Sequence, residues 1–420
     1  MWKAKGSVRY FLSILATAFV QMGVFIYAQK ILSGSFSNAE SGQTWQTFML
    51  QIFFVAPFVL MIWPAGFFTS RFSKNKVLAW SSLLMTLFVT AQAVLVTCDC
   101  PRVAFWLAIG LSSGFAVHSA AKYAIIREMF GVHNLSYANA FLQIFSLIGI
   151  IASSWLAIVG VNLIDLQALV RYEAVGAIIS KSVVIPWILV TVSVLGTVAS
   201  FLIPKVKYND KNIKFSVARR RLSFGWRHRT LRASIIALSM FWALAQVFLL
   251  VFQDVSGSQT VNTMQNYLAF AVVGLVVGSI IAAHNSKDFI ETGFVPLGMI
   301  GASLCMFLIP FFVHPVALSI LYTAIGIFGG MFLVPVNALL QYNTRPNNSG
   351  WVIALANMIQ ALVLVVFLLI YSSLVRFTSL EPPYYFIGLA LISVGVFYWS
   401  ILNLPQALVR SLLRLVFSRY

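Results

Sequence analysis

Twelve runs of predominantly apolar residues, each about as long as a lipid bilayer is thick, constrain this chain more than any other feature. A membrane helix needs about 20 such residues, whereas a membrane β-strand needs only about 10. Only helices and closed barrels satisfy their backbone groups within lipid, and these runs are too long for barrel strands. We therefore predict an all-α polytopic membrane protein with spans at residues 10–32, 46–69, 77–97, 103–126, 136–162, 180–203, 233–254, 264–284, 294–313, 316–340, 351–375 and 384–403.

The composition agrees with this class of protein and excludes several others. Hydrophobic residues make up 60% of the chain and charged residues 9%, whereas soluble domains carry about 25% charged residues. Cys98 and Cys100 are too close in sequence for an ordinary disulfide and have no partners for a zinc site. The N-terminal residues lead into an apolar run of span length without a cleavage site, so we expect no cleavable signal peptide. We also expect no metal, no cofactor and no enzymatic activity, because nucleotide-binding and metalloprotease motifs are not found in the sequence.

The distribution of basic residues predicts the orientation of the spans. Lys122 lies within a span; of the other 27 Lys and Arg, 22 fall on the side of the N-terminus and five on the opposite side. Cytoplasmic loops carry the excess of Lys and Arg, so both termini are expected in the cytoplasm. The net charge of +18 is then mainly a topological signal, and we expect no nucleic-acid partner.

The longest basic loop divides the chain into two sets of six spans. We predict an N-terminal six-helix bundle at 1–203, a basic cytoplasmic linker at 204–232 and a C-terminal bundle at 233–403. Residues 404–420 combine helical apolar spacing with three arginines, which predicts an amphipathic tail on the cytoplasmic surface. The linker could bind anionic headgroups or serve only as a positive-inside connection, and the second interpretation is favoured.

Short internal similarities support a duplication of six spans. The pair Gly110 and Gly114 in "IGLSSGFAVHSAAKY" corresponds to Gly326 and Gly330 in "IGIFGGMFLVPVNAL". Parallel repeats of this kind resemble the two halves of major facilitator transporters. Both pairs, like Gly274 and Gly278, have the G-x-x-x-G spacing that lets helices approach closely.

The loop after the second span also resembles the major facilitator loop signature. It reads "AGFFTSRFSKNKVL" and contains Gly66, Arg71, Lys74 and Lys76. The family has an acidic residue before the arginine, where this chain has Ser70. A gating role and an ordinary basic turn both remain open for this loop.

Polar side chains within the predicted spans are the candidates for a transport pathway. None of the ten Asp and Glu residues lies at the middle of a span, so the carboxylate common in ion-coupled carriers has no counterpart here. Lys122 is predicted five residues from the cytoplasmic end of its helix, where a lysine can also snorkel to the interface. The candidate substrate-binding residues are Thr17, Gln21, His118, Lys122, Tyr123, Gln246 and Asn337.

Three segments together resemble the bacterial lysophospholipid transporter family of the major facilitator superfamily. They are "SAAKYAIIREMF…NLSYANAF", "RFSKNKVL" and "GIFGGMFLVPVNALLQ…ALANMIQ". The resemblance implies alternating access in the bacterial inner membrane and movement of lysophospholipids from the outer to the inner leaflet. It also implies membrane lipids and a cytoplasmic-face acyltransferase as partners, and we expect a monomer.

The chain departs from this family at four positions. Thr17 and Ala18 align with an Asp–Asn pair of the family, and Leu249 aligns with an arginine. Ala120 replaces the proline that precedes the Ala–Lys pair on the fourth span. Lys122 is therefore the one charged cavity group of the family that the chain keeps.

Two other functions remain as alternatives. The first is a carrier of the same fold for a soluble anion or another amphipathic metabolite, although such carriers usually present more charges at depth. The second is a lipid-modifying membrane enzyme, which needs a cluster of His, Asp or Glu at an interface. The short outward loops do not contain such a cluster.

Overall fold

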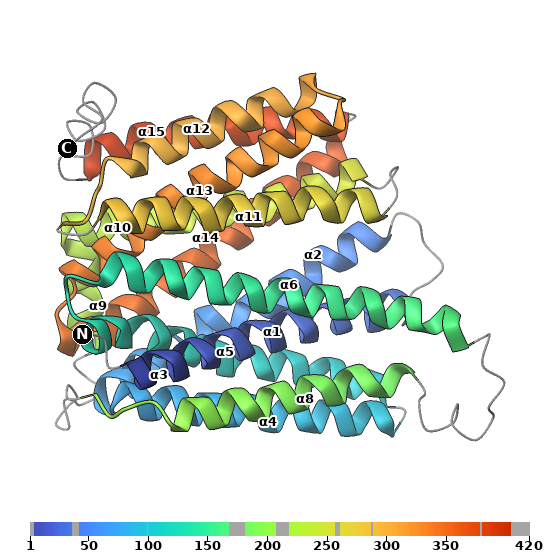
Figure 1. Cartoon of the computed structure of the whole chain (residues 1–420), viewed down its shortest axis with the longest axis horizontal. Helices are drawn as coiled ribbons and strands as arrows, with labels where there is room; N and C mark the ends of the chain where they lie inside the picture. Colours follow the sequence, from blue (N-terminus) through green and yellow to red (C-terminus); the bar gives the residue numbers. More distant parts are fainter. Residues whose placement is uncertain are drawn as a thin grey trace. The chain divides into compact units, whose positions relative to one another are not determined.

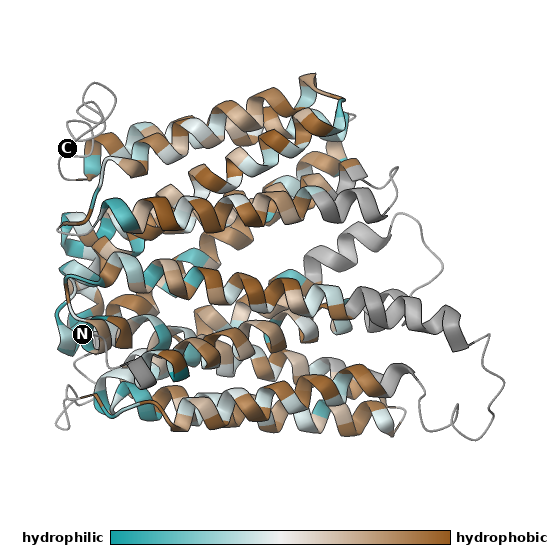
Figure 2. Ribbon diagram, viewed as in Figure 1, coloured by the Kyte–Doolittle hydropathy of each residue, from teal (hydrophilic) through white to brown (hydrophobic). Residues whose placement is uncertain are grey.

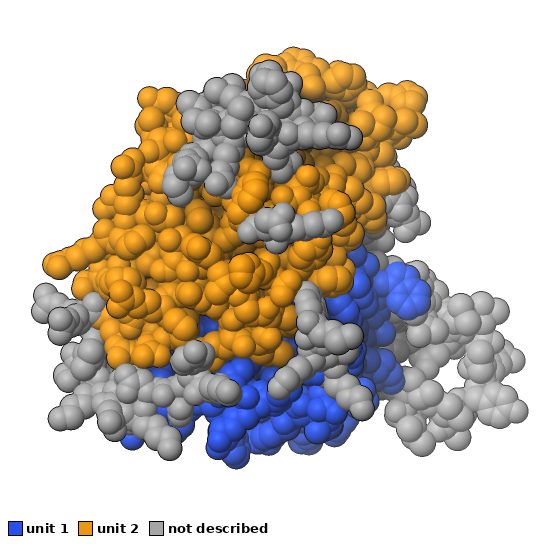
Figure 3. Space-filling view, turned by 60° about the vertical axis from the view of Figure 1, so that its left-hand side comes forward, with its two compact units in different colours: residues 1–125, 145–213 blue, residues 126–144, 214–420 orange. Residues whose placement is uncertain are grey.

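The computed structural model describes residues 4–35, 42–98, 100–167, 181–206, 218–256, 261–286, 289–378 and 380–404. Its contacts divide the chain into two compact units, coloured separately in Figure 3. Unit 1 comprises residues 1–125 and 145–213, and unit 2 comprises residues 126–144 and 214–420. The division between residues 213 and 214 falls within the predicted linker, and residues 126–144 group in addition with the C-terminal half.

Unit 1 is a bundle of α-helices in which α4 and α1 both pack against α8. Its buried core contains Val24, Leu50, Ala93, Leu111 and Leu189. The helices of this unit, labelled in Figure 1, are α1 (Ala4–Ser35), α2 (Gly42–Leu60), α3 (Ile62–Arg71), α4 (Lys74–Thr97), α8 (Lys181–Phe201) and most of α5 (Pro101–Phe130) and α6 (Leu135–Gln167).

Unit 2 is also helical, and its most extensive contact joins α11 to α13. Its helices are α9 (Ala218–Arg227), α10 (Arg229–Ser256), α11 (Val261–Asn285), α12 (Phe294–Leu308), α13 (Pro315–Asn343), α14 (Ser349–Phe377) and α15 (Tyr385–Asn403), with short 3₁₀ turns at Ile309–Phe311, Pro346–Asn348 and Pro382–Tyr384. In Figure 2 the lengths of the helices are mainly hydrophobic, whereas hydrophilic colour gathers around α9 and near helix ends.

Ten of the described helices are long and apolar enough to cross a membrane, and a bent pair provides an eleventh candidate. The prediction of a polytopic all-helical membrane protein is therefore confirmed, and every predicted span falls on a helix or a bent pair. Helix α5, which carries His118 and Lys122, is not among the ten or in the bent pair. The total of twelve spans consequently remains a prediction.

The second predicted span, residues 46–69, is broken in the structure. Helices α2 and α3 meet at Met61 with a bend of 48°. Pro64 has no N–H to donate to the carbonyl of Leu60, so the helical hydrogen-bond ladder is interrupted there. The third span also begins earlier than predicted, at Lys74, which places Lys74 and Lys76 inside α4 rather than in a loop.

The glycine pairs of α11 and α13 bring these two helices into backbone contact. A Cβ atom added at Gly278 would lie 1.9 Å from the carbonyl oxygen of Ile327, and one at Gly326 would lie 1.9 Å from that of Ala271. Neither position has room for a larger residue. The close approach predicted from the G-x-x-x-G spacing is confirmed for this helix pair.

Residues 126–144 form a helical hairpin that belongs to unit 2. The hairpin turns at Gly131, whose φ of 77° lies in the left-handed region that glycine adopts most easily. Ala140 on its second arm is buried with Ala282, Phe294 and Val334 of the C-terminal half. Unit 2 therefore takes part of its core from two helices whose remaining lengths belong to unit 1.

The basic linker is partly helical. Residues 218–227 form α9, and α10 begins at Arg229, within the range assigned to the linker. Residues 207–217 lie outside the described ranges, as does the predicted amphipathic tail after Leu404.

Candidate functional site

A cluster of hydroxyl-bearing side chains lies among four helices of unit 1. Ser13 of α1 hydrogen-bonds with Ser200 of α8 at 2.5 Å between the two Oγ atoms. Ser82 of α4 contacts the same Ser200 Oγ at 3.1 Å. All three side chains are buried, so these bonds satisfy hydroxyl groups that cannot reach water.

Thr86 continues the cluster one turn further along α4. Its Oγ1 lies 2.7 Å from Ser193 Oγ and 2.8 Å from Thr197 Oγ1, both on α8. A third contact, at 2.8 Å, joins Thr86 to Thr90, whose hydroxyl donates to the Thr86 carbonyl. The facing surfaces of α4 and α8 are thus joined by hydroxyl groups rather than by apolar contacts alone.

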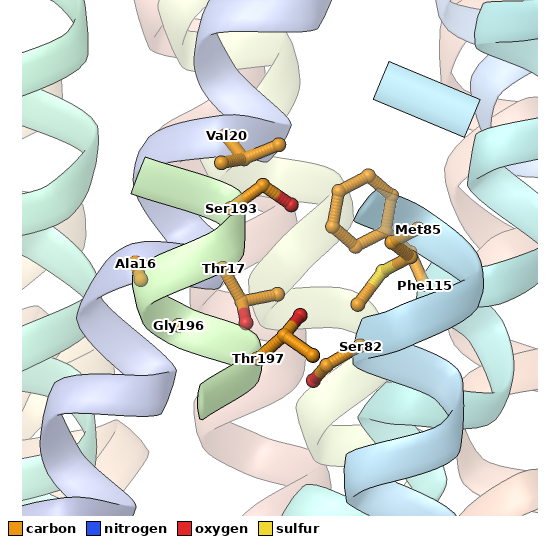
Figure 4. A pocket seen from close by; sticks show the side chains of 9 residues that line it. All are labelled: Ala16, Thr17, Val20, Ser82, Met85, Phe115, Ser193, Gly196 and Thr197. Atoms are coloured by element: carbon orange, nitrogen blue, oxygen red, sulfur yellow. The ribbon is translucent and has the colours of Figure 1, made fainter. Parts of the chain in front are cut away.

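A cavity of about 10 Å³ lies beside this cluster, which is close to the smallest volume that holds one water molecule. Figure 4 shows the hydroxyl side chains of Thr17, Ser82 and Thr197 gathered at this cavity, with Met85 and Phe115 nearby. The residues that line it are Ala16, Thr17, Val20, Ser82, Met85, Phe115, Ser193, Gly196 and Thr197. The cavity is too small for a lipid headgroup.

His118 of α5 is held by the same cluster. Its Nδ1 lies 3.3 Å from the Oγ atoms of both Ser81 and Ser82, while its Nε2 is buried without a hydrogen-bond partner in the described part of the chain. The residue is 2% exposed. Since Nδ1 contacts α4, the imidazole fixes α5 against α4.

Lys122 follows His118 by one helical turn on α5. Its backbone carbonyl accepts a hydrogen bond of 2.8 Å from the buried Tyr10 hydroxyl of α1. Its ammonium lies 4.9 Å from the ring centroid of Tyr123, a separation suited to a cation–π contact. Within the described ranges, Lys122 forms no ion pair with a carboxylate.

The observed α5 is longer than the span predicted around Lys122. The helix continues to Phe130, so Lys122 lies eight residues from its end rather than the five predicted. At 1.5 Å per residue this is roughly 12 Å along the helix axis. This distance refers to the end of the helix and not to the membrane surface; the side chain is half-buried.

The other predicted substrate-binding residues occupy different environments. Thr17 lines the small cavity and donates to the Ser13 carbonyl at 2.8 Å, whereas Gln21 is exposed. Gln246 and Asn337 belong to unit 2. Asn337 is buried, and its amide donates to the Leu333 carbonyl of its own helix at 3.0 Å. The structure thus brings five of the seven predicted residues into one unit.

The four residues of the predicted loop motif also differ in exposure. Gly66 and Lys74 are buried, whereas Arg71 and Lys76 are exposed. The Arg71 guanidinium lies 5.5 Å from the Phe67 ring centroid and 6.0 Å from that of Phe72. Ser70, which replaces the acidic residue of the family signature, is buried, and its Oγ has no hydrogen-bond partner among the residues described.

Sequence reasoning did not identify most of the hydroxyl cluster. Serine and threonine are ordinary residues of membrane helices, where they commonly bond back to their own backbone. One signal was nevertheless present, because Ser193, Thr197 and Ser200 follow a helical spacing that places them on one face of α8. No group of three His, Cys, Asp or Glu that could hold a metal occurs in the described ranges.

Unit 2 contains an apolar groove of about 490 Å³ between α11 and α13. Ser319 and Thr323 contribute its hydroxyl groups, and both donate to carbonyls of their own helix. The remaining lining residues are Phe270, Val316, Ile320, Ala324 and Ile327. The groove therefore offers hydrocarbon contacts and few polar partners.

Curated relatives align with most of the chain. It is 26% identical over 380 residues to the lysophospholipid transporter LplT of Photorhabdus laumondii, covering 87% of this chain and 86% of the relative. It is 25% identical over 379 residues to the protein of the same name from Escherichia coli strain SE11, covering 87% of each chain. A Klebsiella pneumoniae protein of that name is 28% identical over 345 residues, covering 78% and 79% of the two chains.

Solved structures with low sequence identity share the fold. The E. coli fucose:proton symporter FucP is 15% identical with a TM-score of 0.67, and the alignment covers 94% of this chain and 98% of that one. The human organic anion transporter MFSD10 is 13% identical with a TM-score of 0.70, covering 94% and 99%. The family model of the Major Facilitator Superfamily matches residues 10–368. The chain is therefore a multi-pass membrane protein that belongs to the Major Facilitator Superfamily.

Proposed function

We propose that this protein transports lysophospholipids, moving them from the outer to the inner leaflet of a bacterial cytoplasmic membrane. The observation that carries the proposal is the alignment with lysophospholipid transporters over 87% of the chain. It agrees with the resemblance of the segments that lie on α5 and α13. A transporter of this class is favoured over a membrane enzyme.

Lys122 is the proposed contact for the phosphate of the substrate. Lys122 is half-buried, and its ammonium has no carboxylate partner among the described residues. The ammonium can therefore form an ion pair with an anionic substrate. Hydrogen bonds between ammonium and phosphate are charge-assisted and stronger than neutral ones. Tyr123 lies against the ammonium, and the bond from Tyr10 to the Lys122 carbonyl holds this part of α5 in place.

The acyl chain of a lysophospholipid needs an apolar surface. Unit 2 by itself contains such a surface in the groove between α11 and α13, whose hydroxyl groups are bonded to carbonyls of their own helix. This observation is independent of Lys122, which belongs to unit 1. A substrate with one phosphate and one acyl group suits a protein that has few charged residues within its predicted membrane spans. Soluble anion carriers usually present more binding charges within the membrane.

The proposal includes twelve spans with both termini in the cytoplasm and transport by alternating access. The asymmetry of Lys and Arg supports this orientation. We further propose that the protein acts as a monomer and that a cytoplasmic acyltransferase takes up the delivered lysophospholipid. Coupling to an ion is not part of the proposal, because the predicted spans have no carboxylate at mid-depth.

The proposal is tested with purified protein in liposomes that contain a trace of fluorescent lysophosphatidylethanolamine. Reduction of the outer-leaflet probe by dithionite reports the rate at which lysophospholipid changes leaflet. We expect movement several-fold faster than in protein-free liposomes, and competition by unlabelled lysophospholipid. A rate equal to that of protein-free liposomes contradicts the proposal, and competition by soluble organic phosphates alone favours the anion carrier.

A further inference from the structure

Helix α9 is the most strongly basic element that the structure describes. Its ten residues read "ARRRLSFGWR" and contain four arginines and no acidic residue. His228 and Arg229 follow directly. The helix stands at the start of α10, one of the candidate membrane spans, and is labelled in Figure 1.

One face of α9 is fixed to the rest of unit 2. A Cβ atom added at Gly225 would lie 3.2 Å from a side-chain carbon of Leu355 and 3.4 Å from one of Val352, so the helix packs tightly on α14. Arg221 donates from Nη1 to the Asn347 carbonyl at 2.8 Å. The helix therefore has a defined position at the end of the bundle where α14 begins.

Contacts beyond α9 hold the same end of the unit together. Arg229 donates from Nη2 to the Leu402 carbonyl at 2.8 Å, which connects the start of α10 with the last turn of α15. Both helix ends belong to the side that the positive-inside rule assigns to the cytoplasm. The helix thus lies where predicted spans leave the bilayer.

The C-terminal end of α9 and the two residues after it are exposed. Trp226 is 42% exposed, and Arg227, His228 and Arg229 are exposed as well. Tryptophan is enriched at the boundary between headgroups and hydrocarbon, and basic residues near a bilayer surface attract anionic lipids. An exposed tryptophan beside exposed arginines at the end of a span combines both properties.

The sequence alone favours a simple positive-inside connection for the linker, but because Trp226 is exposed beside Arg227 we propose that α9 is a binding surface for anionic phospholipid headgroups of the cytoplasmic leaflet. Trp226 enters the interfacial region, and Arg227 with its basic neighbours contacts the phosphate groups. A membrane surface is the favoured occupant because the spans place α9 next to it and the charges are complementary. Lys122 is not part of this surface, and the proposal does not depend on which substrate is transported.

The experiment measures lipid contact rather than transport. His228→Cys is introduced into a variant in which Cys98, Cys100 and Cys305 are replaced, and the thiol is labelled with an environment-sensitive fluorophore. The protein is reconstituted into vesicles that contain brominated phosphatidylglycerol or brominated phosphatidylcholine at the same mole fraction. The same label at His314→Cys, an exposed position at the start of α13, provides the control.

We expect phosphatidylglycerol to quench the label at residue 228 at least twofold more than phosphatidylcholine, with no preference at residue 314. Arg227→Glu should abolish the preference, while Arg227→Lys should keep it. Salt at 1 M should also abolish the preference for phosphatidylglycerol, because the Debye length then falls to about 3 Å. The salt experiment uses the protein without the Arg227 substitutions. Equal quenching by the two lipids at residue 228, or a preference that survives both Arg227→Glu and high salt, overturns the proposal. An acidic protein as the occupant would give the first of these results.

Discussion

Asn139 and Gln341 form a reciprocal pair of amide hydrogen bonds inside unit 2. Asn139 donates from Nδ2 to Gln341 Oε1 at 2.9 Å, and Gln341 donates from Nε2 to Asn139 Oδ1 at 3.0 Å. Both side chains are at least 97% buried. Arg127 strengthens the same junction, because its guanidinium donates to the carbonyls of Gln341, Tyr342 and Thr344 at the end of α13.

The amide pair predicts a non-additive effect on stability. Asn139→Leu should destabilise the protein by about 1–3 kcal/mol, because it leaves the buried amide of Gln341 without a partner. Gln341→Leu should have a similar effect. The double variant Asn139→Leu/Gln341→Leu should lose less than the sum of the two, since neither amide is then left unpaired. Thermal unfolding in detergent measures all three, and additive losses contradict the reciprocal pairing.

Lys122 predicts a specific loss of transport. If it contacts the substrate phosphate, Lys122→Ala should reduce the leaflet-exchange rate roughly ten- to a hundredfold, as expected for the loss of a charged hydrogen bond. Lys122→Arg should retain part of the rate because the charge remains. Lys205→Ala, which removes an exposed cation outside the loop motif, serves as the matched control. Equal rates in all of these variants at matched protein levels would restore the interfacial-anchor interpretation.

The contact between α11 and α13 predicts a strong dependence on glycine. Gly278→Ala and Gly326→Ala should sharply reduce the yield of folded protein, because each added methyl group meets backbone atoms of the facing helix. Gly395→Ala on α15 is the control, since a Cβ there meets nothing within 4 Å. Its yield should match that of the unaltered chain. Size-exclusion profiles in detergent compare the variants, and normal folding of Gly278→Ala would rule out the close contact.

Thr86 tests the hydroxyl cluster. Thr86→Val removes the hydroxyl at nearly constant volume and should cost about 1–2 kcal/mol of stability, because Ser193 and Thr197 each lose a bond. Thr90→Val should cost less, since the Thr90 hydroxyl donates to the carbonyl of Thr86 within the same helix. Denaturation monitored by circular dichroism compares the two. Equal effects would show that the bonds to α8 contribute no more than a bond within one helix.

The sequence was sufficient to predict the class of fold, since hydrophobic length alone identifies membrane helices. The sequence was less informative about where a helix breaks or begins. The break at Met61 follows from Pro64, and the early start of α4 places Lys74 in a buried position that a basic loop does not suggest. The α11–α13 contact was predictable because glycines four residues apart lie on one face of a helix and let a second helix approach closely.

The candidate site was only partly predictable. Lys122 and His118 stand out in an apolar helix, so their residue types alone identify them. Ser13, Ser82 and Ser200 do not, because only their positions in three separate helices bring the hydroxyl groups together. Asn337 shows the same limit, since polarity at depth does not reveal that its amide bonds to its own helix.

The helical hairpin of residues 126–144 has a consequence for how the protein can be divided. A cut in the linker, after residue 213, yields a C-terminal fragment that lacks Arg127, Asn139 and Ala140. That fragment carries Gln341 without its amide partner and an apolar surface without Ala140. The N-terminal fragment carries the missing piece at the ends of α5 and α6. Separately produced fragments of this chain are therefore complementary, and the C-terminal one completes its core only when the other is present.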